Sequence, residues 1–216
     1  MPEPATIEPD IFEVIGTQRA MRRLKPDPVP EEHIQKLIWA ATRAPNGGNV
    51  QPWRFLVIQD EGKKRALQQI YVAEWAKYTV QDSPQARGAQ SPEALRSLER
   101  NFAAGQYLAD HLHEVPVIII PCGFLLPVNT GIASGSSIYP AVQNLMLAAR
   151  ALGLGTVLTT LHRHREEDVR ALLGVPENAH TAALIPVGWP MGRFGAGPRL
   201  PVAAVTYWDH WGVKRP

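Results

Sequence analysis

The first half of the chain places apolar side chains at helical spacing between two prolines. Pro30 suits the first position of a helix, and Glu31 and Glu32 follow where the helix dipole favours negative charge. The apolar face of this helix consists of Ile34, Leu37, Ile38 and Ala41. Pro45 ends the helix, and a shorter helix is predicted over residues 11–16.

Short apolar runs rich in β-branched residues predict strands in the remainder of the chain. Four such runs lie at residues 55–58, 117–120, 156–160 and 182–187. Residues 202–208 are a candidate for a last strand after a connection rich in glycine and proline.

Two longer helices are predicted from their caps and composition. Ser91 and Pro92 fit the N-cap and first turn of a helix that runs to about His111. Residues 138–152 are apolar round most of the helix circumference, which predicts a fully buried helix. Gly153 is suited to cap its C-terminal end.

The strands alternate with helices, one of them at residues 63–70, but the connections differ greatly in length. Residues 71–90 contain Pro84 and Gly88 and are predicted to be irregular. No strand is followed by a G-x-G-x-x-G turn, so a dinucleotide-binding fold is not supported. The pattern predicts a single α+β domain over residues 1–216, with a mixed central sheet covered by helices.

Composition narrows the possible partners and location. Hydrophobic residues make up 45% of the chain and charged residues 19%, and the formal net charge is only +2, so neither nucleic acid nor a membrane surface is an expected partner. Residues 1–10 lack the pattern of a signal peptide, and no stretch approaches the roughly 20 apolar residues of a membrane span. Cys122 is the only cysteine, so no intramolecular disulfide can form. We therefore expect a cytoplasmic protein.

Two polar segments are candidates for chemistry. Arg19, Arg22, Arg23 and Lys25 form a basic cluster, which is either a solvated turn or a clamp for an anion such as phosphate. Residues 44–53 combine amides and glycines without charge. Asn and Gln side chains can pair with the edge of a heterocycle, although they can equally bond to nearby backbone in a turn.

The order and spacing of these segments resemble the nitroreductase family. The matching segments are Thr17–Arg23, Val29–Glu32, Ala44–Trp53, Ala141–Thr156, and Gly188–Pro190 with Arg199–Pro201. The fourth resembles the family's central dimer helix with its following turn, and the last resembles its C-terminal phosphate segment. The resemblance covers nearly the whole chain outside residues 71–106.

The resemblance implies a mainly antiparallel sheet flanked by helices, in a homodimer with a buried interface helix and two FMN sites between the subunits. FMN would receive hydride from NAD(P)H and reduce a small aromatic acceptor such as a nitroarene or a quinone. Other flavin reactions stay open, namely ene reduction, dehalogenation and an oxidase step. Flavin storage or sensing without turnover is an alternative of a different class.

The resemblance also assigns the cofactor residues by position. The FMN phosphate would be bound by Arg19, Arg22 and Arg199, with Ala20 and Met21 in the same segment. The flavin ring would be lined by Pro45, Asn46, Gly47, Asn49 and Gln51, and Leu158, Thr159 and Thr160 would pass beside its N5. Hydride transfer through flavin needs no protein acid or base, so no catalytic residue is expected.

Several positions depart from the family pattern. Gln18 and Ala20 stand where members often have Arg and Ser, which removes one hydroxyl contact to phosphate. Asn46 replaces a common Ser, and Thr160 stands where some members carry Glu. No metal is expected, because residues two apart on a helix, such as His111 and a second histidine at position 113, point away from each other.

Residues 71–106 are hypothesised to form a lid over the flavin. Trp75 and Tyr78 lie in this insert and Tyr107 lies beside it, where they would stack on planar acceptors. The alternative is a surface helical hairpin whose aromatic side chains pack on the core.

Overall fold

The computed structural model describes residues 10–83, 91–124 and 135–215. Its central sheet contains β1 (Trp53–Ile58), β2 (Val117–Phe124), β3 (Gly155–Thr156), β4 (Ala179–Thr181) and β5 (Ile185–Gly188). The strand order is β1-β2-β5-β3, and β4 also pairs with β2. Every ladder between these strands is antiparallel. The predicted α+β fold with a mainly antiparallel sheet is confirmed.

Strand β2 is the centre of the sheet, and its side chains alternate between two hydrophobic clusters. Val117 and Ile119 pack into one cluster, whereas Ile118 and Ile120 pack into the other. This strand continues past its predicted end at Ile120 as far as Phe124. The chain therefore folds in three layers, with helices on both faces of the sheet.

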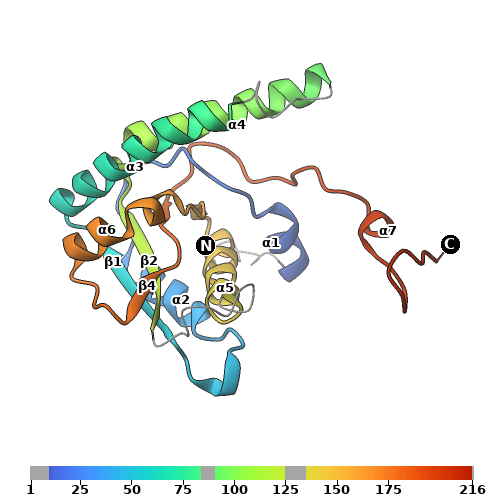
Figure 1. Ribbon diagram of the computed structural model, residues 1–216, viewed down its shortest axis with the longest axis horizontal. Helices are drawn as coiled ribbons and strands as arrows, with labels where there is room; N and C mark the ends of the chain where they lie inside the picture. The colour runs from blue at the N-terminus through green and yellow to red at the C-terminus, as the bar shows by residue number, and fades with distance from the viewer. Residues whose placement is uncertain (1–9, 84–90, 125–134, 216) are drawn as a thin grey trace, which may run out of the picture.

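Each face of the sheet is covered by a different pair of helices (Figure 1). Helices α2 (Glu31–Ala41) and α5 (Ile138–Ala151) pack on each other and share the first cluster with Val117. Helices α3 (Glu61–Gln81) and α4 (Pro92–His111) form a hairpin over the other face, and their buried side chains join Ile118 in the second cluster.

The local signals for helix ends agree with the structure. The Ser91 hydroxyl accepts a hydrogen bond from the Ala94 N–H at 3.1 Å, so Ser91 is the N-cap of α4 as predicted. Gly153 follows α5 with a φ of 76°, a left-handed conformation that favours glycine. Six side chains of α5 are buried, but Gln143 and Ala151 are exposed, so the helix is not buried all round.

The prediction of an irregular segment from residue 71 was wrong for residues 71–81, which continue α3. Its buried stripe consists of Lys64, Leu67, Tyr71, Glu74 and Trp75. Because this stripe includes Lys64 and Glu74, the apolar periodicity is broken although the burial is helical. Asp82 and Ser83 follow α3 outside any helix or strand, as predicted, and residues 84–90 lie outside the described residues.

Three other segments differ in detail from the expectation. Helix α1 (Ile11–Thr17) ends one residue later than predicted. The predicted strand at 156–160 is reduced to β3 and one isolated bridge between Thr159 and Leu184. The predicted strand at 202–208 was wrong, because Val202–Val205 form the short helix α7. These residues are mostly exposed and lie on an arm that extends away from the body (Figure 1).

Two connecting elements complete the fold. A 3-10 helix (Leu161–Arg165) leads directly into α6 (Glu166–Leu173), which ends at Gly174 with a φ of 69°.

Within the described residues, no helix combines the length and apolar character that a membrane span requires.

Candidate active site

One cavity of about 720 Å³ is lined by Arg19 and Arg22 and also by Arg199, which is distant from them in the sequence. Arg19 and Arg22 belong to an extended segment that is tied to β3, because the Met21 N–H donates to the Thr156 carbonyl at 2.8 Å. Arg199 comes from the C-terminal connection. We call Arg19, Arg22 and Arg199 the anion clamp. The fold thus brings together the three residues predicted to bind phosphate.

The other residues of this N-terminal segment divide between cavity and core. Ala20 lines the same cavity as the anion clamp. Met21 is buried in the second hydrophobic cluster, and so is Leu24. The backbone bond of Met21 to β3 therefore holds Arg19 and Arg22 in place while its side chain packs inward.

A second cavity of about 230 Å³ adjoins the first, since Arg22, Trp75 and Tyr78 line both. Its wall includes the predicted residues Leu158, Thr159 and Thr160. The residues predicted to bind the FMN phosphate and the residues predicted to lie beside the flavin N5 therefore line adjoining cavities.

Tyr71 is a residue of this second cavity that the sequence did not identify. Its hydroxyl lies 3.2 Å from Thr159 Oγ1, and burial raises the pKa of the phenol above its ordinary value. The four-residue spacing of Leu67, Tyr71 and Trp75 is the sequence signal that could have revealed it. Tyr71 stays protonated at neutral pH and fixes the position of the Thr159 hydroxyl.

We call residues 44–53, with their Asn and Gln side chains, the amide loop. This loop does not line the cavity of the anion clamp. Pro45, Asn46, Gly47, Asn49 and Gln51 line neither of the two cavities. The loop forms a 3-10 turn at Gly47–Asn49, below α2 in Figure 1 and away from the segment that carries Arg19.

The backbone of the amide loop is unusual. Asn49 and Gln51 have φ angles of 53° and 52°, a left-handed conformation that costs energy for residues other than glycine. The Asn46 side-chain oxygen holds the turn by accepting from the Gln51 N–H at 2.8 Å. This hydrogen bond stabilises the left-handed backbone of the turn.

The aromatic residues of the hairpin pack on one another. The Trp75 ring lies 5.4 Å from the Tyr78 ring and 6.0 Å from the Phe102 ring. Its indole N–H donates to Gln106 Oε1 at 2.8 Å, and only 8% of the residue is exposed. Trp75 therefore joins α3 to α4 and offers little free surface to an acceptor. Opening of the hairpin as a lid stays a prediction.

Two buried polar groups lie beside the second cavity. The Glu74 carboxylate is 2% exposed and forms ion pairs with Lys77 at 2.6 Å and His164 at 3.5 Å. The hydrogen bond from Lys77 lowers the pKa of Glu74. His162 is 1% exposed, and neither ring nitrogen has a hydrogen-bond partner among the residues that the structure describes. Burial lowers its pKa to about 4. His162 is consequently a neutral side chain of the core at pH 7.

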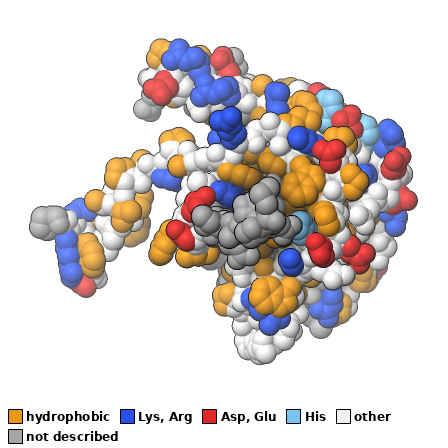
Figure 2. Space-filling view, turned by 180° about the vertical axis from the view of Figure 1, so that it is seen from behind, with side chains coloured by type: hydrophobic (Ala, Val, Ile, Leu, Met, Phe, Trp, Pro, Cys, Tyr) orange, Lys and Arg blue, Asp and Glu red, His pale blue; other side chains and the backbone are white. Residues whose placement is uncertain are grey.

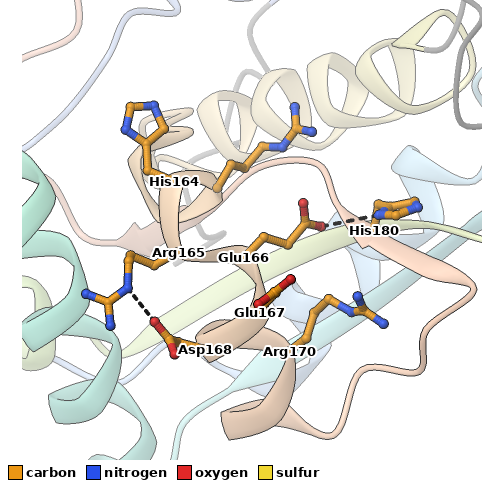
Figure 3. A pocket seen from close by; sticks show the side chains of 8 residues that line it. His164, Arg165, Glu166, Glu167, Asp168, Arg170 and His180 are labelled. Carbon is orange, nitrogen blue, oxygen red and sulfur yellow. Dashed lines mark hydrogen bonds and ion pairs between the residues drawn. The ribbon is translucent and has the colours of Figure 1, made fainter.

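A separate polar hollow of about 470 Å³ surrounds the start of α6 (Figure 3). Two pairs of its side chains contact each other, since Arg165 bonds to Asp168 and Glu166 lies 3.7 Å from His180. None of the predicted cofactor residues lines it. In the part of the chain that the structure describes, no group of three or more His, Cys, Asp or Glu residues could hold a metal ion.

Comparison with known proteins shows the family of this chain. Residues 15–189 match the sequence model of the Nitroreductase family. A Thermus thermophilus protein named NADH dehydrogenase is 33% identical over 196 residues, which cover 88% of this chain and 92% of the relative. The iodotyrosine deiodinase of Thermotoga neapolitana is 27% identical over 180 residues, covering 83% and 88% of the two chains.

The fold is shared with solved structures as well. A crystal structure of oxidized iodotyrosine deiodinase, bound to FMN and 3-iodo-L-tyrosine, has a TM-score of 0.71 and 24% sequence identity. The match covers 89% of this chain and 96% of that one. The fold is that of the nitroreductase class of proteins. The chain belongs to the nitroreductase family.

Proposed function

We propose that this protein is an FMN-dependent oxidoreductase that uses NAD(P)H to reduce a small aromatic acceptor, such as a nitroarene or a quinone. The observation that carries the proposal is the meeting of Arg19, Arg22 and Arg199 around one cavity. No Asp or Glu among the described residues lines that cavity, so an anionic group would not be repelled. Guanidinium donors match phosphate oxygens, and the residues present therefore fit the phosphate of FMN.

The other residues of the cavities would position the ring system. Leu158, Thr159 and Thr160 form a wall of the second cavity, and Tyr71 orients the Thr159 hydroxyl through their 3.2 Å contact. When bound there, FMN would supply the redox chemistry by accepting a hydride and passing its electrons to the acceptor. The protein would contribute orientation, exclusion of water by the α3–α4 hairpin, and positive charge near the phosphate.

We further propose that the active protein is a homodimer. Asn46, Asn49 and Gln51 lie apart from the anion clamp, so within one chain the two halves of the proposed flavin site do not meet. In a two-fold symmetric dimer, the amide loop of one subunit can complete the cavity of the other. We expect an interface beyond ~2,000 Å², the range of obligate dimers.

The C-terminal arm supports the same proposal. It projects from the body and carries exposed apolar side chains, with 84% of Trp211 accessible (Figure 2). Its tip is nevertheless organised: the Trp208 N–H donates to the Val213 carbonyl at 2.9 Å, and Arg215 pairs with Asp209 at 3.0 Å. An ordered apolar arm without a body to pack on is suited to cover a second copy of the chain.

Dehalogenation is a second candidate reaction, because an iodotyrosine deiodinase is among the relatives. The shared requirement is a flavin that can be reduced and then deliver electrons to a ring. The acceptor rather than the cofactor would distinguish the two reactions, so both candidates predict the same cavity and the same anion clamp.

The decisive experiment is an anaerobic titration of the purified protein. We expect yellow protein that releases FMN on heating. Its visible absorbance should bleach with NADH or NADPH and return on addition of nitroarene, quinone or an iodinated phenol. Colourless protein that fails to bind added FMN would refute the proposal. Bound flavin that NAD(P)H does not reduce would favour storage or sensing instead.

A further inference from the structure

Helix α4 brings a fourth arginine to the cavity of the anion clamp. Arg100 lines this cavity together with Ser97, Asn101 and Ala104. These positions are three, four and seven residues apart, so they share one face of the helix. Lys and Arg side chains run along this projecting end of the hairpin in Figure 2. The polar face of α4 is therefore turned toward the proposed cofactor site.

The charge of the cavity exceeds what one phosphate group requires. A phosphate monoester carries at most two negative charges, and the anion clamp already supplies three guanidinium groups. Arg100 adds a fourth, while the described lining residues include no carboxylate. Arg100 is therefore available for an anionic group other than the phosphate of the cofactor.

The cavity also has room and surface for more than a phosphate. Its volume of about 720 Å³ is in the range of small-molecule sites. The rings of Tyr78 and Phe102 both line it, with a centroid separation of 6.0 Å and an interplanar angle of 13°. The Asn101 amide follows Arg100 and offers both a donor and an acceptor. Aromatic surface beside an arginine suits a planar ligand that bears an anionic group.

We propose that Arg100, assisted by Asn101, binds the carboxylate or phosphate of the second ligand, a planar aromatic substrate that is bound while the anion clamp holds FMN. The inference rests on the proposed function. Arg22, Trp75 and Tyr78 line both cavities, so a ligand anchored at Arg100 can extend toward Thr159. Arg100 is then a residue that determines substrate specificity, not a part of the cofactor clamp.

The test uses the FMN-loaded protein with Arg100→Ala and Arg100→Lys. Arg96→Ala is the matched control, because Arg96 is an exposed arginine of the same helix that does not line the cavity. The probes are nitrobenzoate and its neutral analogue nitrobenzene, and their binding to oxidised protein is followed by the change in the visible flavin spectrum. The Michaelis constants for NADH and NADPH are measured with nitrobenzene as acceptor.

If the anion belongs to the acceptor, Arg100→Ala should weaken nitrobenzoate about tenfold and leave nitrobenzene unchanged, as expected for one charge-assisted contact. Arg100→Lys should retain most of the binding. If the anion belongs to the dinucleotide, the Michaelis constants for NADH and NADPH should rise by a similar factor instead. Arg96→Ala should change neither. Either arm supports the inference.

Two outcomes would overturn the inference while the proposed function stands. Unchanged binding of every anionic ligand by Arg100→Ala would show that Arg100 is a solvated surface residue. A loss of FMN affinity matching that of Arg19→Ala would place Arg100 in the cofactor clamp. Failure of the proposed function would appear separately, as wild-type protein that holds no FMN or is not reduced by NAD(P)H.

Discussion

The packing of Trp75 against Gly105 is the contact on which we predict that the α3–α4 hairpin depends. A Cβ atom placed on Gly105 would lie 2.2 Å from Trp75 Cη2 and 2.8 Å from Cζ2, closer than side chains approach each other. The indole therefore occupies the space that an alanine at position 105 would need. Loss of the indole should cost about 3 kcal/mol, the lower part of the range for Trp→Ala, because the ring lies at the edge of the core.

The perturbation is a double-mutant cycle of Trp75→Ala and Gly105→Ala. Alone, Trp75→Ala should lower the midpoint of thermal unfolding by about 6–12 °C, given roughly 2–4 °C per kcal/mol in a chain of this size. Alone, Gly105→Ala should destabilise the protein by about 1–2 kcal/mol, because overpacking outweighs the helix propensity gained. In the Trp75→Ala background the clash is gone, and the same Gly105→Ala change should stabilise by up to about 1 kcal/mol.

The assays are thermal unfolding and urea unfolding, both followed by far-ultraviolet circular dichroism, which does not depend on the fluorescence of the replaced tryptophan. Gly16→Ala is the matched control, since Gly16 lies in α1 and a Cβ there would meet nothing within 4 Å. It should have the same effect in both backgrounds. Equal effects of Gly105→Ala in the two backgrounds, or a Trp75→Ala loss below about 1 kcal/mol, would refute the packing argument. A variant that instead retains its stability and raises only the acceptor Michaelis constant would support the lid.

Three other outcomes are expected. Arg19→Ala or Arg199→Ala should weaken FMN about tenfold with riboflavin affinity little changed, measured by fluorescence titration; equal losses for both flavins would mean that the arginines act through the fold. His162 has a native pKa of about 4 against an ordinary 6.5, so the unfolded chain takes up its proton first as pH falls. Stability should therefore drop between these values by up to about 3 kcal/mol, and His162→Phe should flatten that part of the profile in urea unfolding; identical profiles would contradict this. A chain that ends at Arg199 should dissociate to monomers at concentrations where the full chain sediments as a dimer. A truncated chain that remains dimeric would show that the arm makes no essential intersubunit contact.

Local signals in the sequence were sufficient for several elements. The caps and spacing of α2 and α4 depend on residues within one or two turns, so Pro30 and Ser91 could be read directly from the chain. The alternation of β2 between two clusters likewise follows from a continuous apolar run. The segment that carries Arg19 and Arg22 was recognisable as a motif, because its residue types are close together in the sequence.

Tertiary structure decided the features that depend on contacts between distant residues. The full length of α3 was hidden because its buried face includes Glu74, which is stabilised by Lys77 and by His164 from a different element. Residues 202–208 were predicted as a strand from their apolar composition, but they pair with none of the described strands and form an exposed arm.

In the candidate site, too, some residues could be predicted from the sequence and others were found only in the structure. The resemblance predicted Arg199 as a phosphate ligand, but only the fold shows that it lines the same cavity as Arg19. Only the fold adds Tyr71 and Arg100 from the hairpin. Sequence alone equally could not separate the amide loop from that cavity. Burial and proximity are properties of the packed chain, because each depends on which distant segments cover a side chain, and no window of local sequence contains that information.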